Sequence, residues 1–179
     1  MRSKRIEGKP WLLKFFSFED LTEERKSREK EKGSFHEGRI QFSDEKGLKQ
    51  IILREELPTI RRGEVLRHEL GHLKFDFRNI GVADPFLEPE GEDEDLTEYT
   101  REERLAYWQQ LAEELVASYF ALKGFPKSKD IRRNIYFLKS EALSRGYSPK
   151  QVSLLESKAT SLVGYQGRPV KRLVKESYE

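Results

Sequence analysis

The chain has 179 residues, enough for one domain with its own hydrophobic core, and an aromatic content of 11% argues against disorder. Its 34 basic and 32 acidic side chains leave a net charge of +2, which gives no support for binding to nucleic acid or to a membrane surface. The chain has no cysteine, so disulfides, thiolate metal sites and cysteine nucleophiles are excluded, and any zinc ligand must be His, Asp or Glu.

Residues 1–34 are expected to form an N-terminal segment that packs on the core or flanks it. The apolar patch Trp11–Phe18 predicts a strand or a short helix, and the charged run Leu21–Lys32 predicts an exposed helix. Lys14 interrupts the patch and no small-residue cleavage site follows it, which argues against a secretory signal. No run approaches the roughly 20 apolar residues that span a bilayer, so we expect a cytoplasmic protein.

Residues 35–54 are predicted to form a β-hairpin. One face of its first strand carries His36, Gly38, Ile40 and Phe42 in alternation. Asp44–Gly47 supplies turn chemistry, and Leu48–Leu53 returns as a second apolar strand. A small sheet is therefore expected ahead of the helices.

The segment His68–His72 reads His-Glu-Leu-Gly-His, which is the H-E-x-x-H pattern of metal-binding helices. Residues four apart lie on one helix face with Cβ atoms roughly 5–6 Å apart, so two imidazoles can converge on one ion. Glu69 projects from the flank of that face, where it can reach a water on an open coordination position. The pattern therefore predicts a metal site with His68 and His72 as ligands.

The helix around this motif has an apolar stripe nearly opposite the histidines. The stripe has the spacing of a buried face and consists of Leu66, Leu70, Leu73 and Phe77. It is offset by about 200° from the line Glu64–His68–His72. One face of the helix is therefore expected in a core, and the other in a cleft.

After this helix the chain is predicted to be irregular until a second long helix begins. Asn79–Gly81 is a helix-stop signal, and the acidic stretch Glu88–Glu98 is expected to be a solvated loop, since it lacks the ligand spacing of a calcium loop. The second helix is predicted at Arg101–Lys123, and Glu113 and Glu114 lie where it becomes apolar nearly all round. A carboxylate that enters a core needs a partner, and a metal ion is one such partner.

Residues 127–163 are predicted to form a pair of helices. The first covers Ile131–Ser144, and a turn at Gly146–Pro149 leads into the second, which ends near Val163. Residues 164–179 contain two glycines and a proline followed by mixed charge, and they are expected to be a tail.

With both long helices in view, the chain resembles the gluzincin-type HExxH zinc metallopeptidases, in particular the small ImmA/IrrE-like and minigluzincin group. The resemblance rests on Arg67–His72, which reads RHELGH, and on Glu114–Ala121, which reads E-x-x-A-x-x-F-A. It covers roughly residues 35–126 and implies that this range is a zincin-like metallopeptidase core. The implied fold class is α+β, with a small twisted antiparallel or mixed sheet, an HExxH active-site helix, a glutamate helix and C-terminal helices.

The resemblance also implies the residues of an active site. His68, His72 and Glu114 would hold one Zn²⁺ per chain, and Glu69 would act as general base toward a metal-activated water. The edge strand of the sheet would pair with an extended peptide or protein substrate. The expected activity is zinc-dependent hydrolysis of peptide bonds by an endopeptidase of narrow specificity.

The choice between the adjacent glutamates Glu113 and Glu114 also rests on their helix faces, which are about 100° apart. Glu114 lies in line with small residues that allow a close helix approach, whereas Glu113 lies roughly opposite the stripe Leu111–Leu115–Leu122. Glu114 is therefore the predicted ligand, with Glu113 as the fallback. Ser118, one turn after Glu114, is expected to hydrogen-bond its carboxylate and fix its orientation.

A further donor is expected to stabilise the oxyanion of the reaction. Tyr107 and His36 are the first candidates for this transition-state role, and Tyr119 and Tyr99 are further candidates. Sequence does not choose among these four residues.

Two other interpretations stay open. In one, the protein is a catalytically silent zinc-containing module that binds protein or DNA, and Glu69 argues against it because a structural site needs no carboxylate beside an open position. In the other, residues 1–34 or 164–179 block the cleft of a latent enzyme. The sequence does not determine the oligomeric state.

Overall fold

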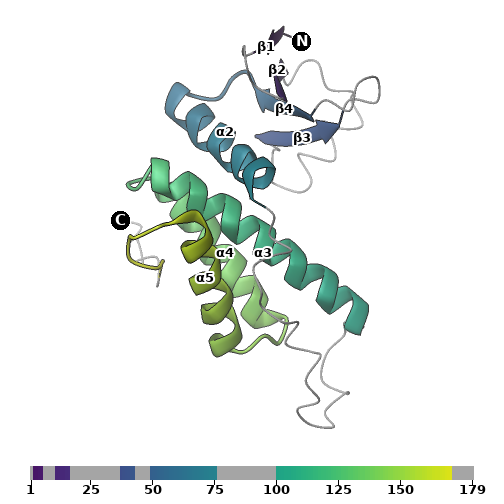
Figure 1. The fold of residues 1–179 in the computed structure, drawn as a ribbon, viewed down its shortest axis with the longest axis vertical. Coiled ribbons are helices and arrows are strands. Elements are labelled where there is room, and N and C mark those ends of the chain that lie inside the picture. Colours follow the sequence, from purple (N-terminus) through teal and green to yellow (C-terminus); the bar gives the residue numbers. More distant parts are fainter. Residues whose placement is uncertain (1, 6–10, 17–36, 43–48, 76–99, 171–179) are drawn as a thin grey trace, which may run out of the picture. The chain divides into compact units, whose positions relative to one another are not determined.

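The computed structural model describes residues 2–5, 11–16, 37–42, 49–75 and 100–170, and the chain divides into two compact units, residues 1–69 and 70–179. The described elements are four strands followed by helices α2 to α5, so the fold class is α+β, as predicted (Figure 1). Among these described helices, none is long and apolar enough to cross a membrane.

The first unit contains a mixed four-stranded sheet in the order β1-β2-β4-β3. Its strands are β1 (Arg2–Arg5), β2 (Trp11–Phe16), β3 (Gly38–Phe42) and β4 (Lys49–Arg54). β2 and β4 pair in parallel, whereas β1–β2 and β3–β4 are antiparallel pairs. Ile51, Ile52 and Leu53 of the central strand β4 are at most 2% exposed, because successive side chains point to opposite faces and both faces are covered.

The strands of the predicted hairpin are confirmed, since β3 and β4 pair with Ile40 opposite Ile51. The sequence left Trp11–Phe18 open between a strand and a short helix, and the structure makes residues 11–16 strand β2. The predicted turn at Asp44–Gly47 and the predicted helix at Leu21–Lys32 lie outside the described residues.

Helix α2 (Thr59–Lys74) carries the histidine motif, and its first turns belong to the first unit. The guanidinium of Arg62 lies 5.5 Å from the ring centroid of Phe15 in β2. It also donates hydrogen bonds to the carbonyls of Glu55 and Leu57, at 2.7 and 3.0 Å. This one side chain therefore joins the start of α2 to a strand and to the loop after β4.

The burial pattern of α2 corrects the predicted apolar stripe. Leu66, Leu70 and Leu73 are only half-buried, and Phe77 lies outside the described residues. The buried positions of the helix are Glu64, Val65, Glu69 and Gly71. The physical reason is that α2 packs through two faces, since Val65 meets β3 within the first unit and Gly71 meets α3 within the second.

The second unit is built on three helices, α3 (Arg101–Gly124), α4 (Lys129–Ser144) and α5 (Pro149–Val163). Both α4 and α5 pack against α3 (Figure 1). The side chains of Thr100, Ser128 and Ser148 cap the three helices by accepting a hydrogen bond from a backbone N–H of the first turn. The predicted helices at Arg101–Lys123 and Ile131–Ser144 are confirmed to within two residues.

The core of this unit lies between α3 and the two helices packed on it. Its most deeply buried large side chains are Leu111, Leu115, Tyr119 and Leu122 of α3, Ile135 of α4 and Leu155 of α5. The stripe Leu111–Leu115–Leu122 predicted for α3 is therefore confirmed.

Residues 164–170, predicted as the start of a tail, turn back onto the helices. Gly164 ends α5 in the left-handed conformation, with φ of 64°. The side chain of Val170 is buried, and its N–H donates to the hydroxyl of Tyr119 at 3.3 Å. Lys139 of α4 donates to the carbonyl of Val170 at 2.8 Å, so this residue is held by both α3 and α4.

Candidate metal centre

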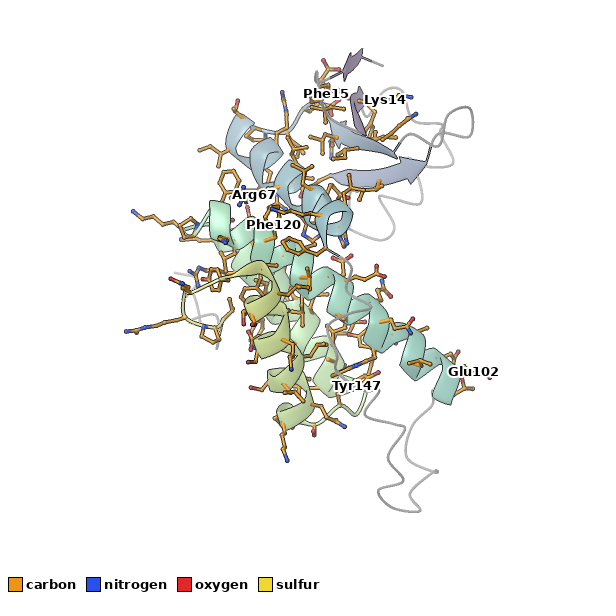
Figure 2. All side chains as sticks on the ribbon, in the orientation of Figure 1. Lys14, Phe15, Arg67, Glu102, Phe120 and Tyr147 are labelled. Carbon is orange, nitrogen blue, oxygen red and sulfur yellow. The ribbon has the colours of Figure 1, made fainter. Side chains whose placement is uncertain are left out.

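The last turns of α2 pack closely on α3 within the second unit. A Cβ atom built on Gly71 would lie 2.7 Å from the Cα atom of Ala117, so the two helix backbones nearly touch there. One turn further on, the ring of Phe75 meets that of Phe120 edge to face with centroids 5.3 Å apart. Phe120 is labelled in Figure 2. Small residues at the crossing and an aromatic pair beside it bring the two helices together.

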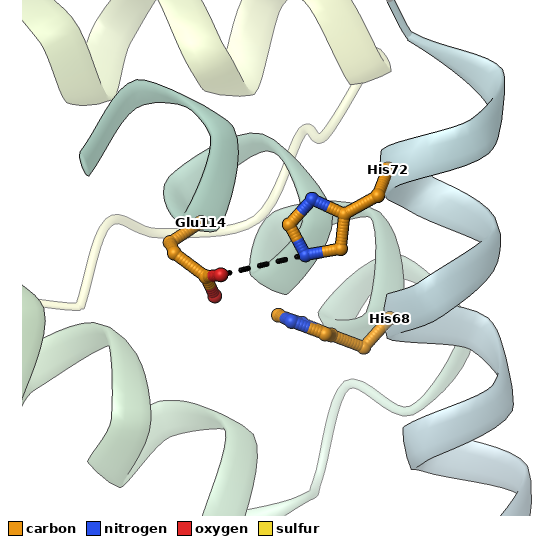
Figure 3. Close-up of side chains that lie close together, drawn as sticks. All are labelled: His68, His72 and Glu114. Carbon is orange, nitrogen blue, oxygen red and sulfur yellow. Dashed lines mark ion pairs between the residues drawn. The ribbon is translucent and has the colours of Figure 1, made fainter. Parts of the chain in front are cut away.

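This packing brings the predicted metal ligands to one place. His72 Nε2 lies 3.5 Å from Glu114 Oε1, and His68 lies one turn before His72 on the same helix (Figure 3). One imidazole nitrogen from each histidine and one carboxylate oxygen of Glu114 all lie within 4.8 Å of one another. The side chains of His72 and Glu114 are 17% and 30% exposed. Within the described part of the chain, this group could hold a metal ion.

Glu69, the predicted general base, is buried in the first unit with 8% of its surface exposed. It lies against the first residue of β3: a Cβ atom on Gly38 would be 3.2 Å from Glu69 Oε1 and 2.5 Å from Val65 Cγ1. A residue with a side chain at position 38 would collide with Val65, so only glycine allows α2 and the carboxylate of Glu69 to lie this close to β3.

Of the two adjacent glutamates, the structure brings Glu114 to the histidines, and the fallback Glu113 is not part of the group of possible ligands. Glu113 is half-buried on the neighbouring face of α3. Ser118 is fully buried, and its hydroxyl accepts a hydrogen bond from Asn134 Nδ2 at 3.1 Å. Its hydrogen bond to the carboxylate of Glu114 stays a prediction.

Tyr107, a candidate for stabilising the transition state, lies in a different environment from the histidines. Arg145 lies 4.1 Å from its ring centroid, and the ring of Tyr147 is 5.9 Å away. Tyr107 lies seven residues before Glu114 in α3, so their Cα atoms are about 10 Å apart along the helix axis. Burial raises the pKa of Tyr107 to about 12, the negative charge of Glu141 adds to this effect, and Arg145 opposes it.

The hydroxyl of Tyr119 is engaged inside the helical unit. It donates to a carboxylate oxygen of Glu156 and accepts the N–H of Val170. Burial, together with the hydrogen bond to Glu156, raises the pKa of Tyr119 far above its ordinary value. The other two candidates, His36 and Tyr99, lie outside the described residues.

A charged bridge at the start of the histidine face was not predicted from the sequence. Glu64, one turn before His68, is 6% exposed and accepts a hydrogen bond from Arg61 Nη1 at 3.0 Å. The Nε of Arg61 also donates to Glu37, just before β3, at 2.9 Å. The i,i+3 spacing of Arg61 and Glu64 is a usable signal, but nothing local in the sequence points to Glu37.

Comparison with known proteins identifies no family for this chain, since it matches no protein-family model, no curated protein and no solved structure. The resemblance to gluzincin peptidases therefore rests on the two sequence motifs. The function has to be argued from the residues of the metal group itself.

Proposed function

We propose that the protein is a zinc-dependent endopeptidase of the gluzincin type, with His68, His72 and Glu114 as metal ligands and Glu69 as general base. The observation that carries the proposal is the convergence of three potential ligand atoms within 4.8 Å. Glu69 follows His68 directly in the same helix, which is the arrangement that hydrolysis of a peptide bond by an activated water needs.

The donor set of this group fits zinc. Two imidazoles and one carboxylate form a known set for catalytic zinc, whereas Ca²⁺ and Mg²⁺ prefer oxygen ligands throughout. No thiolate can take part, since the chain has no cysteine. Three protein ligands leave one position of a tetrahedral ion open, which is typical of catalytic rather than structural zinc.

Bound to these residues, zinc would lower the pKa of a water ligand towards about 7 and polarise the carbonyl of the substrate. Glu69 accepts a proton from the attacking water as the oxygen of that water adds to the carbonyl carbon of the peptide. Glu69 then returns that proton to the nitrogen of the leaving amine as the C–N bond breaks. Its burial against Gly38 keeps the carboxylate in a site of restricted water access.

The substrate is an extended peptide segment. Among the described strands, β3 lies at one edge of the sheet, where an added strand can pair with its backbone. Gly38 of β3 lies beside the carboxylate of Glu69, so a peptide paired with β3 would pass close to the general base. Recognition through the backbone of β3 would leave specificity to the side-chain contacts of alternate residues.

Replacing Glu69 with Gln tests the proposal, because Gln keeps the shape of the side chain but cannot accept the proton of the water. The variant should keep the fold and the zinc content of the wild type and lose peptide cleavage by about 10²–10⁴-fold. Cleavage is measured by mass spectrometry on a peptide library, and zinc by elemental analysis. Glu102→Gln, at an exposed position in the first turn of α3, is the matched control and should cleave like the wild type (Figure 2).

If the zinc-loaded wild type cleaves no member of the library, a truncation after Val170 tests whether the last residues of the chain block the cleft of a latent enzyme. This truncation keeps the buried Val170 in place while it removes the last nine residues of the chain. Cleavage by the truncated protein would support a latent enzyme. If the truncated protein also fails to cleave, a block by these nine residues is excluded, and a block by residues 1–34 and a zinc-containing binding module remain.

A further inference from the structure

The contact between Gly71 and Ala117 leaves no room for a side chain. A Cβ atom on Gly71 would lie 2.7 Å from Cα, 3.2 Å from Cβ and 3.3 Å from the carbonyl oxygen of Ala117. The closest of these atoms belongs to the backbone of α3, and Ala117 is fully buried in the helix interior. A side chain at position 71 therefore cannot be accommodated by the rotation of a neighbouring side chain.

The contact lies directly beside two of the proposed ligands. Gly71 is the residue before His72 on α2, and Ala117 follows Glu114 by less than one turn of α3. Any increase in the separation of the two backbones at this point therefore moves His72 away from Glu114, whose closest atoms are 3.5 Å apart. Zinc sites tolerate deviations of only about 0.2 Å in their ligand distances.

A second contact prevents the helices from sliding past each other to relieve such a displacement. The rings of Phe75 and Phe120 pack edge to face, and the ammonium group of Lys74 lies 5.5 and 5.3 Å from their centroids. These residues follow the Gly71–Ala117 contact by one turn on each helix. The crossing of α2 and α3 is thus held by this second contact, one turn beyond the close approach.

We infer that Gly71 is a positioning residue, whose missing side chain sets the separation of α2 and α3 at which His72 and Glu114 bind one metal ion. The inference rests on the metal-binding part of the proposed function and not on peptide hydrolysis. Gly71 does not touch the metal or the substrate, and it acts through the distance between two ligands.

The test is the zinc affinity of Gly71→Ala, measured by competition with a chelator and referred to the folded fraction. All ligands remain, and the helix propensity of position 71 rises, yet the affinity should fall by about 10–100-fold, the loss typical of disturbed outer partners of a metal site. The matched control is Gly63→Ala, at a glycine of the same helix about 12 Å away, which should bind zinc like the wild type. Substitution by Co²⁺ adds a spectroscopic measurement, since the visible absorption of the ion reports its ligand geometry and should change in Gly71→Ala alone.

A second variant keeps the inference testable if Gly71→Ala does not fold. Ala117→Ser adds one oxygen on the opposite side of the same contact, and it should weaken zinc binding several-fold in a folded protein. Wild-type zinc affinity and a wild-type Co²⁺ spectrum in a folded Gly71→Ala or Ala117→Ser variant would overturn the inference. Failure of the wild type to bind zinc would overturn both this inference and the proposed function, whereas zinc binding without peptide cleavage would count against the proposed function alone.

Discussion

Glu69 of α2 and Glu156 of α5 are both buried, and their carboxylates have very different surroundings. Glu156 of α5 is 5% exposed and accepts hydrogen bonds from Tyr119 of α3 and from Lys139 of α4, the latter at 2.6 Å. Glu69 of α2 is 8% exposed, follows His68 directly, and lies against the glycine that begins β3. Burial alone therefore does not separate a structural carboxylate from one proposed to act in catalysis.

The neighbours of each carboxylate make the difference. Both oxygens of Glu156 accept from side chains of other helices, and the same two side chains hold the N–H and the carbonyl of Val170. That cluster links α3, α4, α5 and residue 170. Because both carboxylate oxygens of Glu156 accept hydrogen bonds within it, we assign Glu156 no role in proton transfer. Glu69 instead stands in a helix whose two histidines converge with Glu114. The comparison predicts that substitutions at Glu156 affect stability, and that substitutions at the metal group affect metal binding.

The largest expected effect is the loss of zinc when a ligand is removed. The wild type should hold about one zinc ion per chain, and Glu114→Ala should lower the affinity by several kcal/mol, more than the 10–100-fold typical of an outer partner. His68→Ala and His72→Ala should show the same loss. The measurement is elemental analysis together with competition by a chelator.

Glu113→Ala is the matched control, since it removes a half-buried carboxylate from the next position of α3 without removing a proposed ligand. It should bind zinc like the wild type. A severe loss in Glu113→Ala with normal binding in Glu114→Ala would reassign the ligand and contradict the geometry of Figure 3. Equal zinc in all of these proteins would show that the metal lies elsewhere.

The second prediction concerns the structural carboxylate. Glu156→Ala leaves the ammonium group of Lys139, with a side chain only 19% exposed, without its acidic partner. Removal of one partner of a buried ion pair costs about 3–5 kcal/mol, and the remaining exposure of Lys139 favours a value of about 3 kcal/mol. Chemical denaturation measures this loss of unfolding free energy, and the zinc affinity of the folded variant should not change.

Glu141→Ala provides the contrast for this experiment. Glu141 pairs with Arg145 one turn away on the surface, with a side chain that is 49% exposed, so its removal should cost no more than about 0.5 kcal/mol. If Glu156→Ala is no more destabilising than Glu141→Ala, the buried cluster does not have the structural role assigned here.

Local signals in the sequence were sufficient for the helices of the second unit. Thr100 and Ser148 mark their helices through a cap followed by Glu or Gln three residues later, and the structure contains both capping boxes. The spacing of the H-E-x-x-H motif likewise predicted two ligands on one face. The choice of Glu114 over Glu113 came from helix geometry and from family register together, and the structure groups Glu114 with the histidines.

Contacts between distant parts of the chain were not predictable in this way. The stripe Leu66–Leu70–Leu73 has the right period for a buried face, but α2 buries Val65 and Gly71 because its partners are β3 and α3. The partners of Glu156 are 17 and 37 residues away, and no local pattern marks them. Val170 has no signal of burial in a stretch rich in glycine, proline and charge.

The smallest expected effect concerns Tyr107, whose hydroxyl contrasts with that of Tyr119. The oxygen of Tyr107 is buried and has no hydrogen-bond partner among the described residues, whereas that of Tyr119 has two. A buried hydroxyl without a partner costs free energy, so Tyr107→Phe should raise the unfolding free energy by about 1 kcal/mol at neutral pH. Chemical denaturation of the zinc-loaded protein measures this gain.

The pH dependence of the same variant sharpens this prediction. Burial raises the pKa of Tyr107 from 10.0 to about 12, so the unfolded chain ionises this group before the folded protein does. This difference leaves the stability of the wild type unaffected below pH 10 and lowers it as the pH rises towards 12, because ionisation of Tyr107 favours the unfolded chain across that range. Tyr107→Phe lacks this group, so its advantage over the wild type should grow across that range. A variant that is instead less stable at neutral pH, or that keeps its zinc but loses peptide cleavage, would show that the hydroxyl has a partner in the active protein and would return Tyr107 to the candidates for the oxyanion donor.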